Sequence, residues 1–321
     1  MQNEQKIKAD RLEYVKDSKS RAVSYRAIGN VEIIDSIRTA ICGIASYDAK
    51  NEEIILNHKP RITSEDRIIK GDQIKLNYTD EVLERIFIPK NAFITSASVG
   101  YNQLKIDSLN TLISFEDRMS SKVLNGFFMN GSLDSLRLIG MASTTYHLFE
   151  DSLYKGKNLT SGDTIIMRFD EKDLDDIVVD GGSRGEYVPN KKTNDSDFPL
   201  FYSADRIDYF LKTETTKLIG NAKAKHENTD LKAGFIEVNW PTRILNAFPK
   251  QPHDSINQFI KPTIIEKGRD PMVGNEMTYN LDTKKGKINN GKTKADDGFY
   301  KGRLIKDLRK PIKEESEEVT S

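Results

Sequence analysis

Nine short stretches of this chain alternate apolar and polar residues and end on an aromatic side chain. The residue before each aromatic is polar, and the residue two before it is apolar in eight of the nine stretches. Because successive side chains of a strand point to opposite faces, this pattern predicts repeated β-structure with one dry and one wet face. The aromatics recur at intervals of 23 to 40 residues and are Tyr14, Tyr47, Tyr78, Phe115, Tyr146, Phe169, Tyr209, Trp240 and Tyr279.

The most regular element is a strand of the form (Ala/Gly)-Asp-x-(Ile/Leu)-x-aromatic. Two copies are nearly identical and two are longer: 9–14, 204–209, 71–78 and 162–169. The pairs Gly29-Asn30 and Gly220-Asn221 interrupt the strands that follow two of these copies. Glycine inside a strand pattern marks a bulge or a sharp bend. The sequence therefore predicts two-stranded units, folded at a kink, that stack into one continuous sheet.

The recurring acids of these strands are predicted to bond the neighbouring backbone at turns or edges rather than to form a catalytic pair. They are Asp10, Asp72, Asp163 and Asp205. The glycine-rich stretch 181–185 follows a strand without opening a helix, so it is predicted to be a bend and not a phosphate loop.

The composition favours a thin, elongated molecule. Of the 321 residues, 37% are hydrophobic and 31% are charged, which is polar for a compact globule of this size. The 49 basic residues balance the 49 acidic residues, which argues against nucleic acid as a partner. No apolar run predicts a membrane-spanning helix, and the first residues do not resemble a signal peptide.

Catalytic and metal-binding signals are weak. Cys42 is the only cysteine, so no internal disulfide framework is expected, and its apolar neighbours predict a small strand residue. The four histidines do not have metal-ligand spacing, and no nucleophile is paired with a base. The sequence predicts no catalytic residue, no metal site and no cofactor.

Two irregular segments divide the repeats. The predicted organisation is a first half of the repeats at 1–187, a loop at 188–199, and a second half at 200–302 with an irregular insertion at 248–273. The insertion is predicted because four of the ten prolines lie within it. Residues 303–321 are predicted to be a charged, disordered tail.

A basic stretch stands near the end of the chain. Between Lys284 and Lys313 there are eleven Lys or Arg and three Asp, a net charge of +8. One interpretation is a solvated strand face, and the other is a contact with anionic groups such as lipid phosphates or an acidic partner. The residues assigned to that contact are Lys284, Lys285, Lys287, Lys292 and Lys294.

Residues 9–33 and 204–224 resemble the repeat of the OstA-like family, and residues 275–302 resemble the periplasmic part of the outer-membrane lipopolysaccharide assembly protein. The family comprises LptA-like periplasmic proteins and the LptD periplasmic domain. The resemblance implies an all-β fold: an elongated antiparallel β-jellyroll, or V-shaped "β-taco" solenoid, of repeated two-stranded units. It also implies non-enzymatic binding and transport of lipopolysaccharide, or a related glycolipid, in the periplasm at the outer membrane. The implied partners are other jellyroll proteins, stacked edge to edge, and an outer-membrane barrel component.

The resemblance makes the dry face a groove for acyl chains. The predicted lining residues are Leu12, Tyr14, Leu76, Tyr78, Ile113, Phe115, Met167, Phe169, Ile207, Tyr209, Val238, Trp240, Met277 and Tyr279. The alternative is that these side chains pack against one another as a closed sandwich core. Two other functions stay open from the sequence: a polysaccharide-active parallel β-helix enzyme, and a purely structural, self-assembling solenoid.

Overall fold

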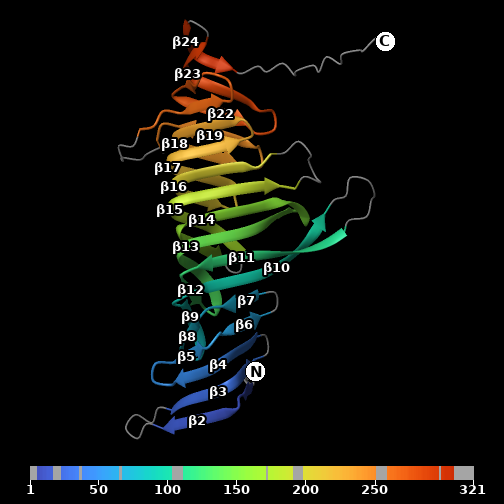
Figure 1. Ribbon diagram of the computed structural model, residues 1–321, viewed down its shortest axis with the longest axis vertical. Helices are drawn as coiled ribbons and strands as arrows, with labels where there is room; N and C mark the ends of the chain where they lie inside the picture. The colour runs from blue at the N-terminus through green and yellow to red at the C-terminus, as the bar shows by residue number, and fades with distance from the viewer. Residues whose placement is uncertain are drawn as a thin grey trace.

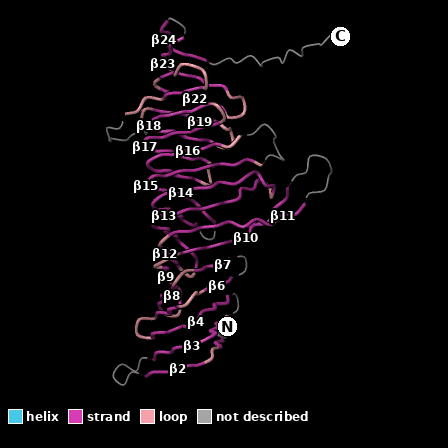
Figure 2. Tube along the Cα trace, in the orientation of Figure 1, coloured by secondary structure: helices cyan, strands magenta, loops and turns pink. Residues whose placement is uncertain are grey.

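The strands stack like rungs along one long axis. The computed structural model describes residues 6–16, 23–35, 38–64, 67–102, 111–170, 173–190, 198–250, 259–295 and 298–306. These residues form 24 strands of one sheet, with 6–16 and 298–306 at opposite ends of the stack (Figure 1). Strands are the regular elements along the whole trace (Figure 2), and the described residues hold no helix that could cross a membrane.

Many passes of the chain across the sheet are single strands. They are β3 (Val23–Ile34), β4 (Arg38–Asp48), β13 (Ser132–Glu150), β14 (Leu153–Asp170), β15 (Asp173–Pro189), β16 (Leu200–Phe210), β17 (Thr215–His226), β18 (Thr229–Asn239), β23 (Lys285–Ala295) and β24 (Gly298–Lys306).

The other passes are broken into two short strands. The pairs are β1 (Lys6–Lys8) with β2 (Arg11–Lys16), β5 (Glu53–Asn57) with β6 (Arg61–Ser64), β7 (Arg67–Lys70) with β8 (Gln73–Thr79), β9 (Val82–Ile88) with β10 (Ala92–Asn102), β11 (Thr111–Ser121) with β12 (Val123–Met129), β19 (Ile244–Phe248) with β20 (Thr263–Glu266), and β21 (Met272–Val273) with β22 (Glu276–Asn280).

Each pass contributes one segment to each of two arms. The first arm contains β1, β6, β7, β10, β11, β20 and β21, and the second contains β2, β5, β8, β9, β12, β19 and β22. Neighbouring strands pair antiparallel, apart from a single parallel contact of Tyr101 with Leu153. The predicted all-β antiparallel jellyroll is confirmed. The parallel pairing that a β-helix enzyme requires between its coils is not the pairing observed.

A hydrogen-bonded corner holds the bend between the arms. Gly220 and Asn221 have φ angles of 73° and 46°, and the register of β16 with β17 and of β17 with β18 shifts there. The Asn221 amide donates to both oxygens of Asp205, at 3.1 and 2.9 Å. Because only glycine and, less often, asparagine adopt this left-handed conformation readily, the Gly-Asn pair fits the bend.

The same corner recurs along the stack. Asn30 donates to Asp10 at 3.0 Å, and Asn91 donates to both oxygens of Asp72 at 3.0 Å. The fourth recurring acid, Asp163, packs against Gly181, which has a φ of 79°. The recurring aspartates are therefore bend residues, as predicted, but three of them accept hydrogen bonds from an asparagine side chain of the next pass and not from the neighbouring backbone. The glycine-rich stretch 181–185 contains a bend.

Two predicted boundaries differ from the structure. The stretch 248–273, predicted to be an irregular insertion, contains the strands β20 and β21, which pair with β18 and β23. The prolines interrupt this pass, but its first-arm segment is still formed. The backbone N–H of Ile260 donates to the carbonyl of Pro249, and the carbonyl of Ile260 accepts from the N–H of Gly234. Of the predicted loop 188–199, Val188 and Pro189 belong to β15, and 191–197 lie outside the described residues. The tail beyond Lys306 also lies outside them.

The core lies between the arms, where both dry faces meet. Strand β17 shows the alternation that places it there, with Leu218, Ala222 and Ala224 buried and Lys223 and Lys225 exposed. Fully buried side chains continue along the stack: Leu56, Ile74, Ile88, Leu124, Leu138, Ile165, Ile207, Leu218, Ile236 and Leu245.

Two glycine substitutions separate backbone strain from crowding: Gly131 lies in the turn between β12 and β13, whereas Gly220 lies at the bend. Gly131 has a φ of 77° with no atom within 4 Å of an added Cβ, so Gly131→Ala should cost about 1–2 kcal/mol of unfolding free energy. At Gly220 an added Cβ would also lie 2.4 Å from the Asp205 carboxylate, so Gly220→Ala should cost more. Urea unfolding followed by circular dichroism measures both variants. Equal losses of unfolding free energy in the two variants would show that the corner tolerates a Cβ at Gly220.

Candidate functional site

A cavity of about 400 Å³ lies between the arms in the N-terminal part of the stack. The first arm contributes Ile33, Ala40, Ile62, Ile69, Ile94 and Met119. The second arm contributes Ile54, Leu56, Leu76, Leu83, Ile86, Leu124, Phe128, Leu133, Leu136 and Met167. The side chains of both walls are largely apolar, so the cavity suits an apolar ligand.

Polar groups gather where the strands of the first arm end. Asp35 and Arg38, at the turn between β3 and β4, form an ion pair of 3.3 Å, and Ser64 and Arg67 flank the turn between β6 and β7. Burial raises the pKa of Tyr78 on the second arm, while Arg38 lowers it and Asp35 raises it. The cavity thus has apolar walls and a charged margin.

A buried acid–histidine pair lies at another part of the wall. Asp117 is 5% exposed and accepts hydrogen bonds from the backbone N–H of His147 at 2.9 Å and from its Nδ1 at 2.7 Å. The imidazole packs against Phe115, with ring centroids 4.7 Å apart. Because His147 donates to Asp117 twice, the pair fixes β11 to β13, and the two hydrogen bonds account for the burial of the carboxylate.

The two arms are tied together farther along the stack. Tyr209 on the second arm shares hydrogen bonds with Thr160 at 3.0 Å and Tyr202 at 3.1 Å, both on the first arm. At the strand ends, the rings of Tyr187 and Trp240 lie 5.1 Å apart. We call these five residues the clasp. They fill the space between the arms that is empty in the N-terminal part.

Cross-arm contacts continue beyond the clasp. His226 lies 3.5 Å from the Tyr279 hydroxyl, and the Lys284 ammonium lies 2.5 Å from Glu227. Lys284 also lies 4.5 Å from the ring centre of Phe198. The C-terminal part of the jellyroll is therefore closed by side chains from both arms.

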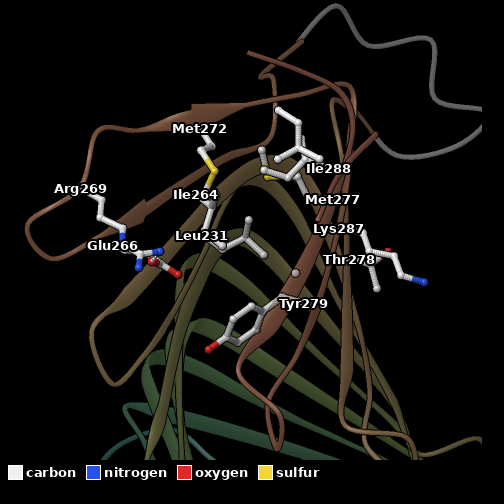
Figure 3. Close-up of a pocket in the computed structure, with 12 residues that line it drawn as sticks. Leu231, Ile264, Glu266, Arg269, Met272, Met277, Thr278, Tyr279, Lys287 and Ile288 are labelled. Carbon is white, nitrogen blue, oxygen red and sulfur yellow. Dashed lines mark hydrogen bonds and ion pairs between the residues drawn. The ribbon is translucent and has the colours of Figure 1, made fainter. Parts of the chain in front are cut away.

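A second, smaller cavity of about 140 Å³ lies at the C-terminal end. Figure 3 shows Met272, Ile264, Leu231, Met277 and Tyr279 around it, with Ile288 beside them. At its margin Arg269 pairs with the buried Glu266 at 2.9 Å.

The predicted groove residues separate into distinct environments. Leu76, Tyr78, Met167 and Phe169 line the large cavity, and Met277 and Tyr279 line the small one. Ile207, Tyr209 and Val238 are buried, Trp240 is half-buried, and Tyr209 and Trp240 belong to the clasp. Ile113 and Phe115 lie on the first arm, where Phe115 stacks on Tyr154 at 4.3 Å. Leu12 and Tyr14 are 65% and 61% exposed in β2, at the N-terminal end of the stack.

The five lysines predicted to contact anionic groups also lie in different environments. Lys284 is engaged in the cross-arm ion pair with Glu227. Lys285, Lys287 and Lys292 are exposed, and the Lys287 ammonium points away from the small cavity in Figure 3. Lys294 lies in β23, directly opposite Phe299.

Sequence reasoning missed most of the cavity wall. It followed one column of aromatics and so, apart from Ile113 and Phe115, selected residues of the second arm, and it missed Ile33, Ile62, Ile69 and Ile94 of the first arm. The isoleucines within 61–70 could have signalled a second dry face, since Ile62 of β6 lies directly opposite Ile69 of β7. Across the described ranges, no cluster of three or more His, Cys, Asp or Glu could hold a metal.

Removing one clasp hydroxyl should destabilise the fold. Tyr209→Phe keeps the buried ring but leaves the buried Thr160 hydroxyl without its Tyr209 partner, which should cost about 1–3 kcal/mol of unfolding free energy. Tyr101→Phe is the control, because Tyr101 is 40% exposed, and it should change stability by less than about 0.5 kcal/mol. Chemical denaturation compares the two variants, and similar values would contradict a clasp.

Alkaline pH should also weaken the clasp. Burial raises the pKa of Tyr202 and of Tyr209 above the ordinary value of 10.0. The unfolded chain therefore releases these protons first, so stability is fully present below about pH 10 and falls as pH rises beyond it. The double variant Tyr202→Phe/Tyr209→Phe should lose stability less steeply above pH 10 in denaturation titrations. An unchanged slope would rule out these hydroxyls as the cause.

Known proteins resemble this chain in sequence and in structure. Residues 1–82 match the model of a family described as LptA/(LptD N-terminal domain) LPS transport protein. The crystal structure of LptH, the LptA homologous periplasmic component of the conserved lipopolysaccharide transport device from Pseudomonas aeruginosa, is similar at 16% identity and a TM-score of 0.37, covering 46% of this chain and 93% of that chain. No curated protein matches this chain. The resemblance to the OstA-like family, predicted from the repeats, is confirmed by the family match over residues 1–82.

Proposed function

We propose that this protein binds lipopolysaccharide, or a related glycolipid, and passes it across the periplasm towards the outer membrane without enzymatic chemistry. The observation that carries the proposal is the cavity of about 400 Å³ with apolar walls from both arms and a charged margin. Such a site matches an amphiphile, whose acyl chains enter the cavity while its headgroup stays at the margin. The family match over residues 1–82 supports the same function.

The energy of acyl burial is sufficient for binding. Burying one CH₂ group contributes about 0.8 kcal/mol. A chain of about twelve carbons therefore offers on the order of 8–10 kcal/mol before the costs of ordering the ligand. This contact is non-directional, so it suits a ligand that must slide along the cavity rather than lock into one pose.

The headgroup side of the ligand is proposed to face the ends of the first-arm strands. Arg38 and Arg67 lie there with Asp35, and the Arg38 side chain is 44% exposed despite its ion pair. Guanidinium groups pair well with phosphate, and the flexible Arg38 can exchange its carboxylate partner for one.

The clasp sets the extent of the bound chain. Because Tyr187, Tyr202, Tyr209 and Trp240 fill the space between the arms, an acyl chain bound in the large cavity ends before them. The small cavity beyond is a separate compartment lined by Met277 and Tyr279. Passage from one compartment to the other requires the clasp to open.

The ends of the stack are proposed to join other proteins. In the described part of the chain, β2 pairs only with β3 and β24 pairs only with β23, so each has an edge with unpaired backbone groups. Such edges recruit a further strand. The proposed partners are other jellyroll transport proteins and an outer-membrane barrel component.

Photo-crosslinking tests the proposed ligand and its place. A benzoylphenylalanine at Leu76 or Phe128, both in the cavity wall, should give adducts with lipopolysaccharide when the protein is made in producing cells. The same group at Lys223, exposed on β17, should give none. No adduct at either cavity position would overturn the proposal in favour of a purely structural solenoid. Equal adducts at all three positions would show that the cavity is not the specific lipid site.

A further inference from the structure

The last two strands of the stack carry charge of one sign. Strand β23 contains four lysines, and β24 contains Lys301, Arg303 and Lys306, with no Asp or Glu in either strand. Lys292 lies directly opposite Lys301, and Lys287 directly opposite Lys306. Like charges directly opposite each other on paired strands repel, so the basic residues destabilise the pairing of β23 with β24. Within the described residues, Lys292, Lys301 and Arg303 have no acidic partner that could offset it.

The opposite end of the stack is basic as well. Residues 6–16 contain four Lys or Arg and two acids, a net charge of +2. Glu13 pairs with Arg11 at 3.0 Å, and Glu32 of the neighbouring β3 pairs with Lys8 at 2.7 Å, so the positive excess at this edge rests on Lys6 and Lys16 and is smaller than the excess at β24. A second copy of this chain placed end to end would therefore bring β24 against another basic edge.

We infer that the β24 edge selects an acidic edge strand of a different jellyroll protein and rejects a second copy of this chain. This inference rests on the edge-to-edge stacking in the proposed function and adds that charge decides which edge can stack on β24. Lysines on an open edge are a common defence against unwanted strand pairing. Here the same charges attract a strand rich in Asp or Glu, so repulsion and attraction together define the partner.

Reversing the charge of the edge converts repulsion into attraction. In the variant Lys292→Glu/Lys301→Glu/Arg303→Glu, an acidic C-terminal edge meets the basic N-terminal edge of the next copy. Sedimentation velocity of the full chain should show a monomeric wild type at low salt. The variant should self-associate on the order of tenfold more strongly, and salt should weaken that association because it screens exposed charges.

The matched control is Lys223→Glu/Lys225→Glu/Lys232→Glu. It changes the net charge equally, and Lys223 and Lys232 form a directly opposed pair on exposed positions of β17 and β18, away from both ends. The control should stay monomeric. Self-association of the wild type or of the control as strong as that of the edge variant would overturn the inference, as would a monomeric edge variant.

Two further measurements distinguish strand pairing at the β24 edge from lipid binding there. If the wild type binds vesicles containing phosphatidylglycerol and the edge variant loses that binding without self-associating, the edge contacts a lipid surface and the inference is wrong. Crosslinking of lipopolysaccharide at Leu76 should persist in the edge variant. If the wild-type protein itself gave no lipopolysaccharide adduct at Leu76, that result would instead count against the proposed function.

Discussion

The bend in each rung is the constraint on which the rest of this structure depends. A flat sheet with one dry face would leave that face in water, and the bend folds the sheet so that both arms cover the same interior. The corner is held outside the core by Asp205 and Asn221 and by their counterparts along the chain. Because these bonds need no volume inside, the interior is left to the side chains between the arms.

What fills that interior differs along the stack. In the N-terminal part, aliphatic side chains from both arms leave about 400 Å³ unfilled. In the C-terminal part, Tyr209 and Trp240 reach across to the first arm and close the space. One backbone architecture therefore supports both an open compartment and a filled section, and the difference depends on whether the aromatic residue contacts the opposite arm.

The sequence predicted the strands and bends well because both follow local rules. Alternation fixes which face is dry, and Asp followed by Gly-Asn in the next pass fixes the corner. The fate of each aromatic could not be predicted in the same way. Tyr78 and Tyr209 occupy equivalent places in their repeats, yet Tyr78 lines the cavity and Tyr209 bonds to Thr160. That difference depends on residues 49 positions away, and the ion pair of Lys284 with Glu227 depends on a similarly remote contact.

The neighbour-to-neighbour pairing has a consequence for how the chain reaches this structure. Most passes pair with the pass just before and just after them, as β16 does with β15 and β17, so each new rung closes only a short loop. Chains built in this way can nucleate at any rung and grow outward in both directions. The strands β19 and β20, on either side of the connection between Phe248 and Thr263, both pair with β18, so connections of this kind are where the sequence can lengthen while the stack keeps forming.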